Sequence, residues 1–186
     1  MSRVRIIGGE WKRRLINVPL AKGLRPTPDA VRETLFNWLG QDLTGLSCLD
    51  LFAGSGALGF EAASRGAAHV TLVENDARVY AQLEDNARGL AGEGGDARLE
   101  ILRMDALKFV SRPTLLTRRY DVLFLDPPYR QGWMERVEPW LAGLLAPGAL
   151  IYAEAEHALA HIGAWRCVRE GRAGQVFYHL LEAQDE

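Results

Sequence analysis

The sequence has few of the features that mark disulfide-bonded or metal-binding proteins. Only two of its 186 residues are cysteines, Cys48 and Cys167, and they fit no metal-ligand or redox spacing. We therefore expect two buried thiols in a reducing compartment. The four histidines show no ligand spacing either, so the sequence predicts no metal site.

Long apolar segments are also lacking. No apolar run reaches the roughly 18 residues that a membrane-spanning helix needs. Residues 1–5 lack the apolar core of a signal peptide, and the chain has no internal repeat or low-complexity tract. With 48% hydrophobic and 25% charged residues, the composition is typical of a globular protein. We expect a cytoplasmic monomer without membrane contact.

Charge is unevenly distributed along the chain. The net charge is −2, yet the first 28 residues hold seven basic residues and one acidic residue. A basic segment on an acidic body suggests a local surface for a polyanion. Apolar residues alternate with the basic ones between Val4 and Val18, which favours a folded arm over a disordered tail.

The first 40 residues predict a hairpin followed by a helix. Residues 3–7 alternate polar and apolar, two glycines follow, and residues 11–18 can return as a partner strand. Thr27 is a suitable cap for a helix that continues with Pro28 and ends before Gly40. We expect residues 1–24 to form a basic β-hairpin extension that contacts RNA, and residues 25–186 to form the main domain.

From residue 47 onwards, strands and helices alternate. Apolar runs predict strands at residues 48–52, 69–73, 99–102, 122–125 and 149–153. Helices are expected between them, at residues 58–64, 76–90, after 105, and 134–145. This alternation predicts a parallel sheet with right-handed crossovers. Strands at residues 165–170 and 175–181 around a glycine-rich turn predict an antiparallel hairpin at the sheet edge.

A glycine-rich loop and three acidic residues predict a cofactor site. Residues 54–59 have the pattern Gly-x-Gly-x-x-Gly between a strand and a helix, where the backbone can approach a ligand. Glu74 ends the next strand and can accept hydrogen bonds from two ribose hydroxyls. Asp50 would repel a pyrophosphate but attract an ammonium group, which favours S-adenosyl-L-methionine over NAD. Asp105 can cap a helix or accept a hydrogen bond from an adenine amino group.

The segment Asp126-Pro127-Pro128-Tyr129 follows an apolar strand, and its two prolines end that strand. The Asp126 carboxylate and the Pro127 carbonyl can accept hydrogen bonds from a planar amine, while Tyr129 can stack on the ring that carries it. The prolines keep these groups in place. The alternative is a stiff surface loop in which Asp126 has no chemical role.

This series of motifs resembles that of the class I S-adenosyl-L-methionine-dependent methyltransferases. The resemblance implies a Rossmann-like fold with a mostly parallel seven-stranded sheet, helices on both faces, a C-terminal antiparallel hairpin and a small N-terminal β-hairpin extension. It rests on residues 50–59, Glu74, Asp105 and residues 126–129.

Two further stretches, residues 5–12 and 23–39, resemble the RsmD family. That resemblance implies methyl transfer to the exocyclic N2 of a guanine in 16S ribosomal RNA, within an assembled or assembling small ribosomal subunit. The family often has Phe at the position of Tyr129, a difference that keeps the aromatic face. The choice of guanine over adenine rests on this resemblance alone.

Together the motifs and the resemblance define three groups of candidate residues. The catalytic candidates are Asp126, Pro127, Pro128 and Tyr129. The cofactor candidates are Asp50, Phe52, Ala53, Gly54, Ser55, Gly56, Glu74, Asn75, Asp105 and Ala106. The RNA-binding candidates are Arg3, Arg5, Trp11, Lys12, Arg13, Arg14 and Arg25. Trp11 fits a hairpin core as well as it fits an RNA contact.

Three other functions fit parts of the sequence. A DNA adenine-N6 methyltransferase shares the chemistry of residues 126–129 but usually needs a separate recognition domain. A methyltransferase of protein glutamine side chains favours Asn at the position of Asp126 and would not need a basic arm. A non-catalytic RNA-binding assembly factor would not need the intact turn at residues 126–129.

Overall fold

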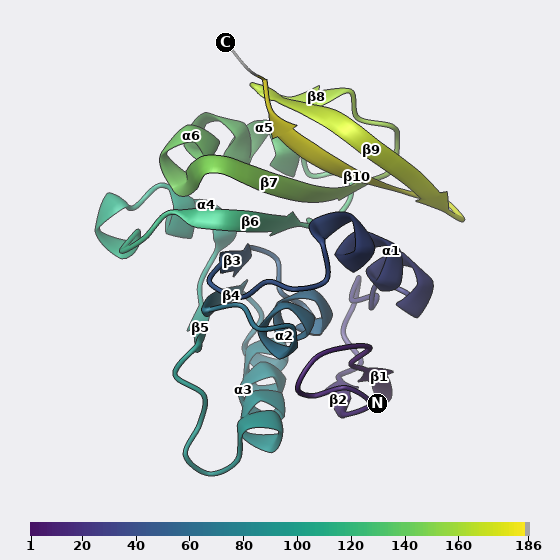
Figure 1. The fold of residues 1–186 in the computed structure, drawn as a ribbon, viewed down its shortest axis with the longest axis vertical. Coiled ribbons are helices and arrows are strands. Elements are labelled where there is room, and N and C mark those ends of the chain that lie inside the picture. Colours follow the sequence, from purple (N-terminus) through teal and green to yellow (C-terminus); the bar gives the residue numbers. More distant parts are fainter. Residues whose placement is uncertain (185–186) are drawn as a thin grey trace.

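The computed structural model describes residues 1–184 and has one mixed eight-stranded sheet at its centre (Figure 1). Its strands are β3 (Ser47–Asp50), β4 (His69–Glu74), β5 (Leu99–Arg103), β6 (Tyr120–Leu125), β7 (Leu145–Ala155), β8 (His161–Ile162), β9 (Trp165–Ala173) and β10 (Val176–Ala183). Their order in the sheet is β5-β4-β3-β6-β7-β10-β9-β8. The first five are parallel, and the last three are antiparallel to their neighbours. This confirms the predicted parallel sheet with an antiparallel C-terminal hairpin.

Helices cover both faces of the sheet, because successive strand residues point to opposite sides. Leu72 and Val73 of β4, for example, belong to two different hydrophobic clusters. The cluster around Leu72 includes residues of α1 (Asp29–Leu39), α2 (Ala57–Ser64) and α3 (Ala77–Ala91). The cluster around Val73 includes residues of α4 (Ala106–Val110), α5 (Trp133–Val137) and α6 (Leu141–Leu144).

Two details of the main domain differ from the sequence prediction. The helix expected at residues 134–145 is divided into α5, a 3₁₀ turn (Glu138–Trp140) and α6. Pro139 lies in that turn and has no backbone N–H to continue an α-helical ladder. The two-residue strand β8 was not predicted, because so short a segment carries no recognisable periodicity. A second 3₁₀ turn covers Pro113–Leu115.

The N-terminal hairpin pairs β1 (Ser2–Arg5) with β2 (Leu15–Val18) in antiparallel register. The two glycines lie between the strands, as predicted, within a wide loop at residues 6–14. Two hydrogen bonds between Ile6 and the far side of the loop close it: the Ile6 N–H donates to the Arg14 carbonyl at 2.9 Å, and the Arg13 N–H donates to the Ile6 carbonyl at 2.9 Å. The loop packs against α2, so its shape is set by tertiary contacts.

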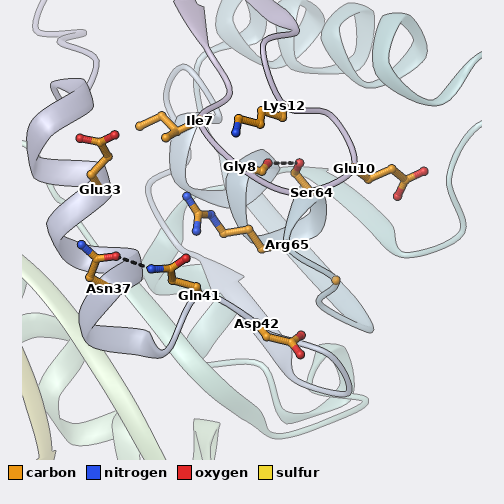
Figure 2. Close-up of a pocket in the computed structure, with 12 residues that line it drawn as sticks. Ile7, Gly8, Glu10, Lys12, Glu33, Asn37, Gln41, Asp42, Ser64 and Arg65 are labelled. Atoms are coloured by element: carbon orange, nitrogen blue, oxygen red, sulfur yellow. Dashed lines mark hydrogen bonds between the residues drawn. The ribbon is translucent and has the colours of Figure 1, made fainter.

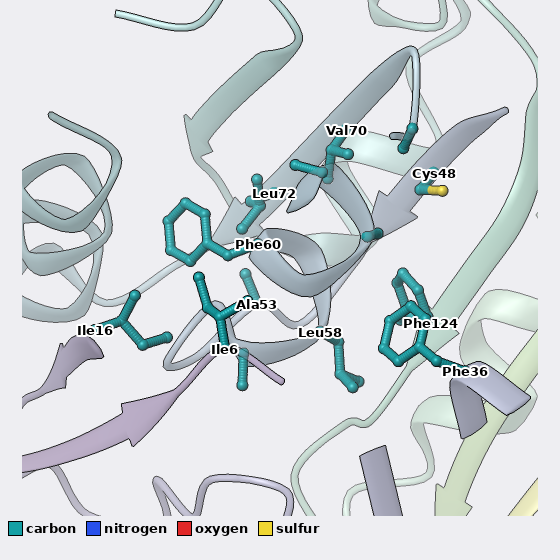
Figure 3. Close-up of a cluster of buried hydrophobic side chains, with 14 of the residues drawn as sticks. Ile6, Ile16, Phe36, Cys48, Ala53, Leu58, Phe60, Val70, Leu72 and Phe124 are labelled. Carbon is teal, nitrogen blue, oxygen red and sulfur yellow. The ribbon is translucent and has the colours of Figure 1, made fainter. Parts of the chain in front are cut away.

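The hairpin shares its hydrophobic core with the main domain. Ile6 and Ile16 are fully buried in the same cluster as Phe60 of α2 and Leu72 of β4 (Figure 3). Burial of such side chains contributes roughly 1.5–3 kcal/mol each. The arm is therefore fixed to the body rather than loosely attached.

The start of α1 differs from the prediction that Thr27 caps it. The helix begins at Asp29 after Pro28 and has no side-chain cap. The Thr27 hydroxyl instead donates a hydrogen bond to Glu154 of β7 at 3.1 Å. Gly40 ends the helix in a left-handed conformation, as the sequence predicted.

No helix within residues 1–184 has both the length and the apolar character that crossing a membrane requires. In the same part of the chain, no three His, Cys, Asp or Glu side chains are grouped as metal ligands would be.

Candidate active site

Four carboxylates line one edge of the sheet, which we call the acidic edge: Asp50, Glu74, Asp126 and Glu154. Asp50 and Glu74 are the last residues of β3 and β4, Asp126 directly follows β6, and Glu154 is next to last in β7. These four strands are neighbours in the order β4-β3-β6-β7 and are parallel, so their carboxyl ends meet. This is the edge where open α/β sheets bind ligands.

Asp50 is the most deeply buried of the three carboxylates for which the sequence predicted a cofactor role. It is 2% exposed, and its Oδ2 atom accepts a hydrogen bond from the Gly59 N–H at 3.0 Å. Burial raises the pKa of Asp50 to about 7; the Gly59 bond opposes this shift and the Glu74 charge adds to it. A buried carboxylate beside other carboxylates favours a cationic ligand.

The glycine-rich loop is folded tightly against the helix that follows it. Gly56 has φ +81°, and a Cβ atom there would lie 2.4 Å from the Phe60 ring. The Gly54 N–H donates to Glu74 at 3.0 Å, and the other Glu74 oxygen accepts the Asp76 N–H at 2.8 Å. The loop and the end of β4 thus form one unit, with Glu74 between them.

The remaining cofactor candidates lie around this unit. Asp105 caps α4, since its Oδ1 atom accepts the Lys108 N–H at 3.1 Å. Its Oδ2 atom accepts no hydrogen bond from residues 1–184, which leaves an acceptor for a ligand. The Phe52 ring packs edge-on against Trp133 at 5.0 Å between centroids. Ala53, Ser55 and Ala106 are buried, and Asn75 is exposed.

The turn after β6 combines a shielded acid with an exposed aromatic ring. Pro127 is buried, whereas Pro128 is exposed and Tyr129 is 40% exposed. Burial raises the pKa of Asp126 well above its usual range, and the Glu154 carboxyl group and the Asp50 charge raise it further. Burial, followed by the charge of Asp126, raises the pKa of Tyr129 to about 12.

The segment between the hairpin and α1 passes in front of this edge. The Leu24 side chain packs on Gly54, where an added Cβ atom would lie 2.9 Å from its Cδ1 atom. The Arg25 charge opposes the rise in the pKa of Tyr129, which indicates that Arg25 lies near the turn at residues 126–129. Residues 19–28 therefore connect the basic arm to the candidate site.

The basic candidate residues of the arm differ in whether their side chains form ion pairs or hydrogen bonds within the protein. Arg3, Lys12 and Arg13 are exposed and form no ion pair within residues 1–184. Arg5 pairs with Asp29 at 3.5 Å, and the Arg14 guanidinium donates to a backbone carbonyl at 2.6 Å. The first three are the better candidates for contacts with phosphates.

Trp11 does not offer the RNA-stacking surface that the sequence prediction considered. Its side chain is 4% exposed and belongs to the main hydrophobic cluster. The Arg98 guanidinium covers the ring at 5.5 Å from its centroid, and the Trp11 N–H donates to Ser64 at 2.9 Å. The prediction of a stacking role is therefore wrong, and Trp11 is a core residue.

A separate cleft of about 880 Å³ lies between the arm loop, α1 and the C-terminal end of α2 (Figure 2). Among the candidate residues it contains only Lys12. The Arg65 guanidinium points into it, donates to Glu61 at 2.9 Å and lies over the Phe36 ring at 4.8 Å. The cleft contains no carboxylate of the acidic edge.

Glu154 was missed by the sequence reasoning. It lies in an apolar run, residues 149–155, that reads simply as a buried strand. An acidic residue within such a run was the available signal, because ionisable groups are rarely buried without a role or a partner.

The sheet order and the acidic edge together define a class I methyltransferase fold. A family model described as conserved hypothetical protein 95 matches residues 4–182. The chain belongs to the RsmD family.

Individual relatives match along almost the whole chain. It is 46% identical to ribosomal RNA small subunit methyltransferase D of Escherichia coli K12, over 100% of this chain and 93% of the relative. It is 42% identical to the Haemophilus influenzae protein of the same name, over 97% of this chain and 94% of the relative. The solved structure of yhhF from Escherichia coli superposes with a TM-score of 0.85 and 41% identity, over 100% of both chains.

Proposed function

We propose that this protein transfers a methyl group from S-adenosyl-L-methionine to the exocyclic N2 of a guanine in 16S ribosomal RNA. The names of its relatives support ribosomal RNA of the small subunit as the substrate. The observation that carries the proposal is the position of the turn at residues 126–129, beside the buried carboxylates that favour a cationic ligand. Membership of the RsmD family supports guanine N2 as the acceptor.

The candidate cofactor residues fit S-adenosyl-L-methionine. The ligand has a positive sulfonium and a positive ammonium group, and Asp50 is a buried carboxylate at the same edge. Glu74 can exchange its backbone hydrogen bonds for ribose hydroxyls, and Asp105 has an oxygen left for an adenine amino group. When bound, the cofactor supplies a methyl group already activated by the positive sulfur.

Residues 126–129 would hold the acceptor amine. The lone pair of an exocyclic amine is delocalised into the purine ring, so the nitrogen is a weak nucleophile. Hydrogen bonds from its two N–H groups to the Asp126 carboxylate and the Pro127 carbonyl would draw the nitrogen towards a tetrahedral shape. Pro127 and Pro128 fix these acceptors, and the exposed Tyr129 ring can stack on the base. The protein contributes positioning and electrostatic alignment.

We propose residues 1–24 as the RNA-contact extension of a methyltransferase domain at residues 25–186. Arg3, Lys12 and Arg13 would contact phosphates, and Arg25 would act closer to the catalytic turn. Because the base must be presented outside its stack, a folded RNA within a small ribosomal subunit is the expected partner. We propose a cytoplasmic monomer.

Replacing the catalytic carboxylate tests this function. Asp126→Ala should keep its affinity for S-adenosyl-L-homocysteine within about twofold, because the Asp50 and Glu74 contacts remain. Methyl transfer should fall by about 10²-fold or more, since an aligned acceptor of the amine protons is lost. Calorimetry measures the affinity, and labelled-methyl transfer to small-subunit particles measures the rate.

The same assay with other substrates separates the rival functions. Naked 16S RNA, small-subunit particles, duplex DNA and protein are each incubated with labelled donor. Label in RNA that depends on Asp126 supports the proposal. Label in DNA or protein alone, or RNA binding with no transfer to any substrate, would contradict it.

A further inference from the structure

Glu154 is a buried acid beside the catalytic turn. Its side chain is 6% exposed, and no Lys or Arg within residues 1–184 forms an ion pair with it. Leu125 of β6 pairs with Ala153 of β7, so Asp126 and Glu154, one residue further along each strand, are neighbours at the acidic edge. Buried carboxylates are normally paired with a cation or hold a proton, and this one lies against a second carboxylate.

Two hydroxyl groups hold Glu154 in place. The Tyr152 hydroxyl donates to its Oε1 atom at 2.6 Å, and the Thr27 hydroxyl donates to the same atom at 3.1 Å. All three residues are buried. This leaves Oε2 as the oxygen with free lone pairs. Besides burial, the Glu154 charge raises the pKa of Asp126, in keeping with the position of the two groups at neighbouring strand ends. A negative charge beside a buried acid raises the affinity of that acid for a proton.

We propose that Glu154 is a positioning residue for methyl transfer, and that Asp126 and Glu154 act as one acid pair that takes up the proton released by the methylated amine. Glu154 acts through Asp126 and does not touch the base. The proposal rests on the proposed function, because it concerns the reaction at the same turn.

The acceptor amine must lose one proton during methyl transfer, and in this proposal Asp126 takes it up. As its bond to the methyl carbon forms and the carbon–sulfur bond of the donor breaks, the amine nitrogen carries one proton more than the product. That N–H bond then breaks, its electron pair stays on nitrogen, and an O–H bond forms on Asp126. The negative Glu154 next to Asp126 increases its affinity for that proton. Asp126 is only partly buried, so the proton can afterwards pass to water.

Other ionisable groups face the pair from each neighbouring element. Asp50 lies at the end of the adjacent strand β3, and Tyr129 lies in the same turn as Asp126. Tyr152, also in β7, donates a hydrogen bond to Glu154. Tyr178 of β10 is the register partner of Glu154. The Arg25 charge acts on Tyr129 from the segment before α1. None of these residues changes in a Glu154 variant, so such a variant isolates the contribution of Glu154.

The test is Glu154→Gln, which removes the charge while its amide oxygen can still accept from Tyr152 and Thr27. The acid limb of the pH–rate profile should move to lower pH by about one unit, because Asp126 loses its negative neighbour. The plateau rate should fall about tenfold or more, since the remaining base is weaker. Affinity for S-adenosyl-L-homocysteine should stay within about twofold.

A second measurement needs neither cofactor nor RNA. Titration of the Asp126 carboxyl carbon by NMR should show a lower pKa in Glu154→Gln than in the parent protein. Tyr152→Phe, which keeps the ring but removes one donor to Glu154, should change the profile by less than Glu154→Gln does. Glu182→Gln, at a partly exposed site paired with Arg166, is the matched control and should change neither measurement.

The outcomes separate this proposal from the proposed function. A Glu154→Gln protein whose pH profile and Asp126 titration match those of the parent would overturn the role of Glu154 while leaving methyl transfer established. A parent protein that transfers no methyl group to RNA would overturn the proposed function itself.

Discussion

Asp50 illustrates how burial determines the chemistry of a single residue. It is enclosed at the end of β3 with one backbone donor, and the nearby carboxylate of Glu74 adds to the cost of its negative charge. Its pKa of about 7 lies above the ordinary value of 3.8. The folded protein therefore holds this proton more tightly than the unfolded chain does, which stabilises the fold at low pH. The contribution is lost as the pH rises from about 4 towards 7.

Replacing Asp50 by a neutral side chain should remove the loss of folding stability that its ionisation causes as the pH rises. We expect Asp50→Asn to raise the free energy of unfolding of the ligand-free protein by roughly 2–4 kcal/mol at pH 8, with little difference near pH 4. The affinity for S-adenosyl-L-methionine should fall, because the carboxylate that we propose faces its ammonium group is gone. Urea unfolding at both pH values and calorimetry measure these effects. Asp85→Asn, at an exposed position, is the control.

An Asp50→Asn protein less stable than the parent at pH 8 would contradict this explanation. It would mean that the ionised carboxylate is better compensated in the fold than its surroundings indicate.

The sequence was sufficient to identify candidate site residues that stand at or next to the end of a predicted strand. Asp50, Glu74 and Asp126 each follow an apolar strand, so their place at one edge could be predicted. Glu154 could not be assigned, because its partners Thr27 and Asp126 are distant in sequence. Trp11 could not be placed either, because an aromatic residue in a basic segment fits a core and an RNA surface equally well.

At the scale of elements, Glu61 connects the arm, α1 and α2. Its side chain is 0% exposed and accepts the backbone N–H groups of Ile7 and Gly8 at 3.0 and 2.8 Å. It also pairs with Arg65 at 2.9 Å and with the fully buried Arg32 of α1 at 3.3 Å. One carboxylate thus satisfies donors from three segments, which explains why the loop at residues 6–14 is wide.

Removing this carboxylate should destabilise the whole fold. Glu61→Ala should lower the free energy of unfolding by about 3–5 kcal/mol, because Arg32 would be left as a buried charge with less compensation and two backbone N–H groups would lose their acceptor. Glu33→Ala, at an exposed position of α1, should change it by about 0.5 kcal/mol or less. Urea denaturation of the two variants makes the comparison, and equal losses would contradict the role assigned to Glu61.

Elements were predictable where the local pattern and the tertiary contacts agree. The strand at residues 122–125 is apolar throughout, as a strand buried on both faces must be. The width of the loop around Gly8 and Gly9 could not be predicted from the local pattern, because the loop follows α2: a Cβ atom on Gly9 would lie 1.9 Å from the Ser64 carbonyl oxygen. Gly9 therefore permits close packing against α2.

At the scale of the whole molecule, charge is separated between the arm and the body. The arm is basic, while the chain as a whole has a net charge of −2 and the candidate site is lined by carboxylates. In the proposed function the basic arm would attract RNA and the acidic edge would attract a cationic donor, so each ligand would be directed to its own surface. The segment at residues 19–28 joins the two.

Neutralising the exposed cations of the arm tests this separation. Changing Arg3, Lys12 and Arg13 together to Ala should weaken RNA binding and reduce the slope of log affinity against log salt by about 2–3, as expected for three lost phosphate contacts. Thermal stability and cofactor affinity should not change, because these side chains are exposed. Filter binding at several salt concentrations measures the slope. An equal effect from Arg103, Arg112 and Arg119 changed together to Ala would show that attraction is diffuse.

We propose that the turn at residues 126–129 is where the protein methylates a guanine of small-subunit ribosomal RNA. The most direct measurement is nucleoside mapping by mass spectrometry of 16S RNA from cells that lack this protein, with the parent gene or the Asp126→Ala gene returned. We predict that one N2-methylguanine is missing, that the parent gene restores it and that the variant does not. An unchanged set of modified guanines in the deficient cells, or restoration by Asp126→Ala, would contradict the claim.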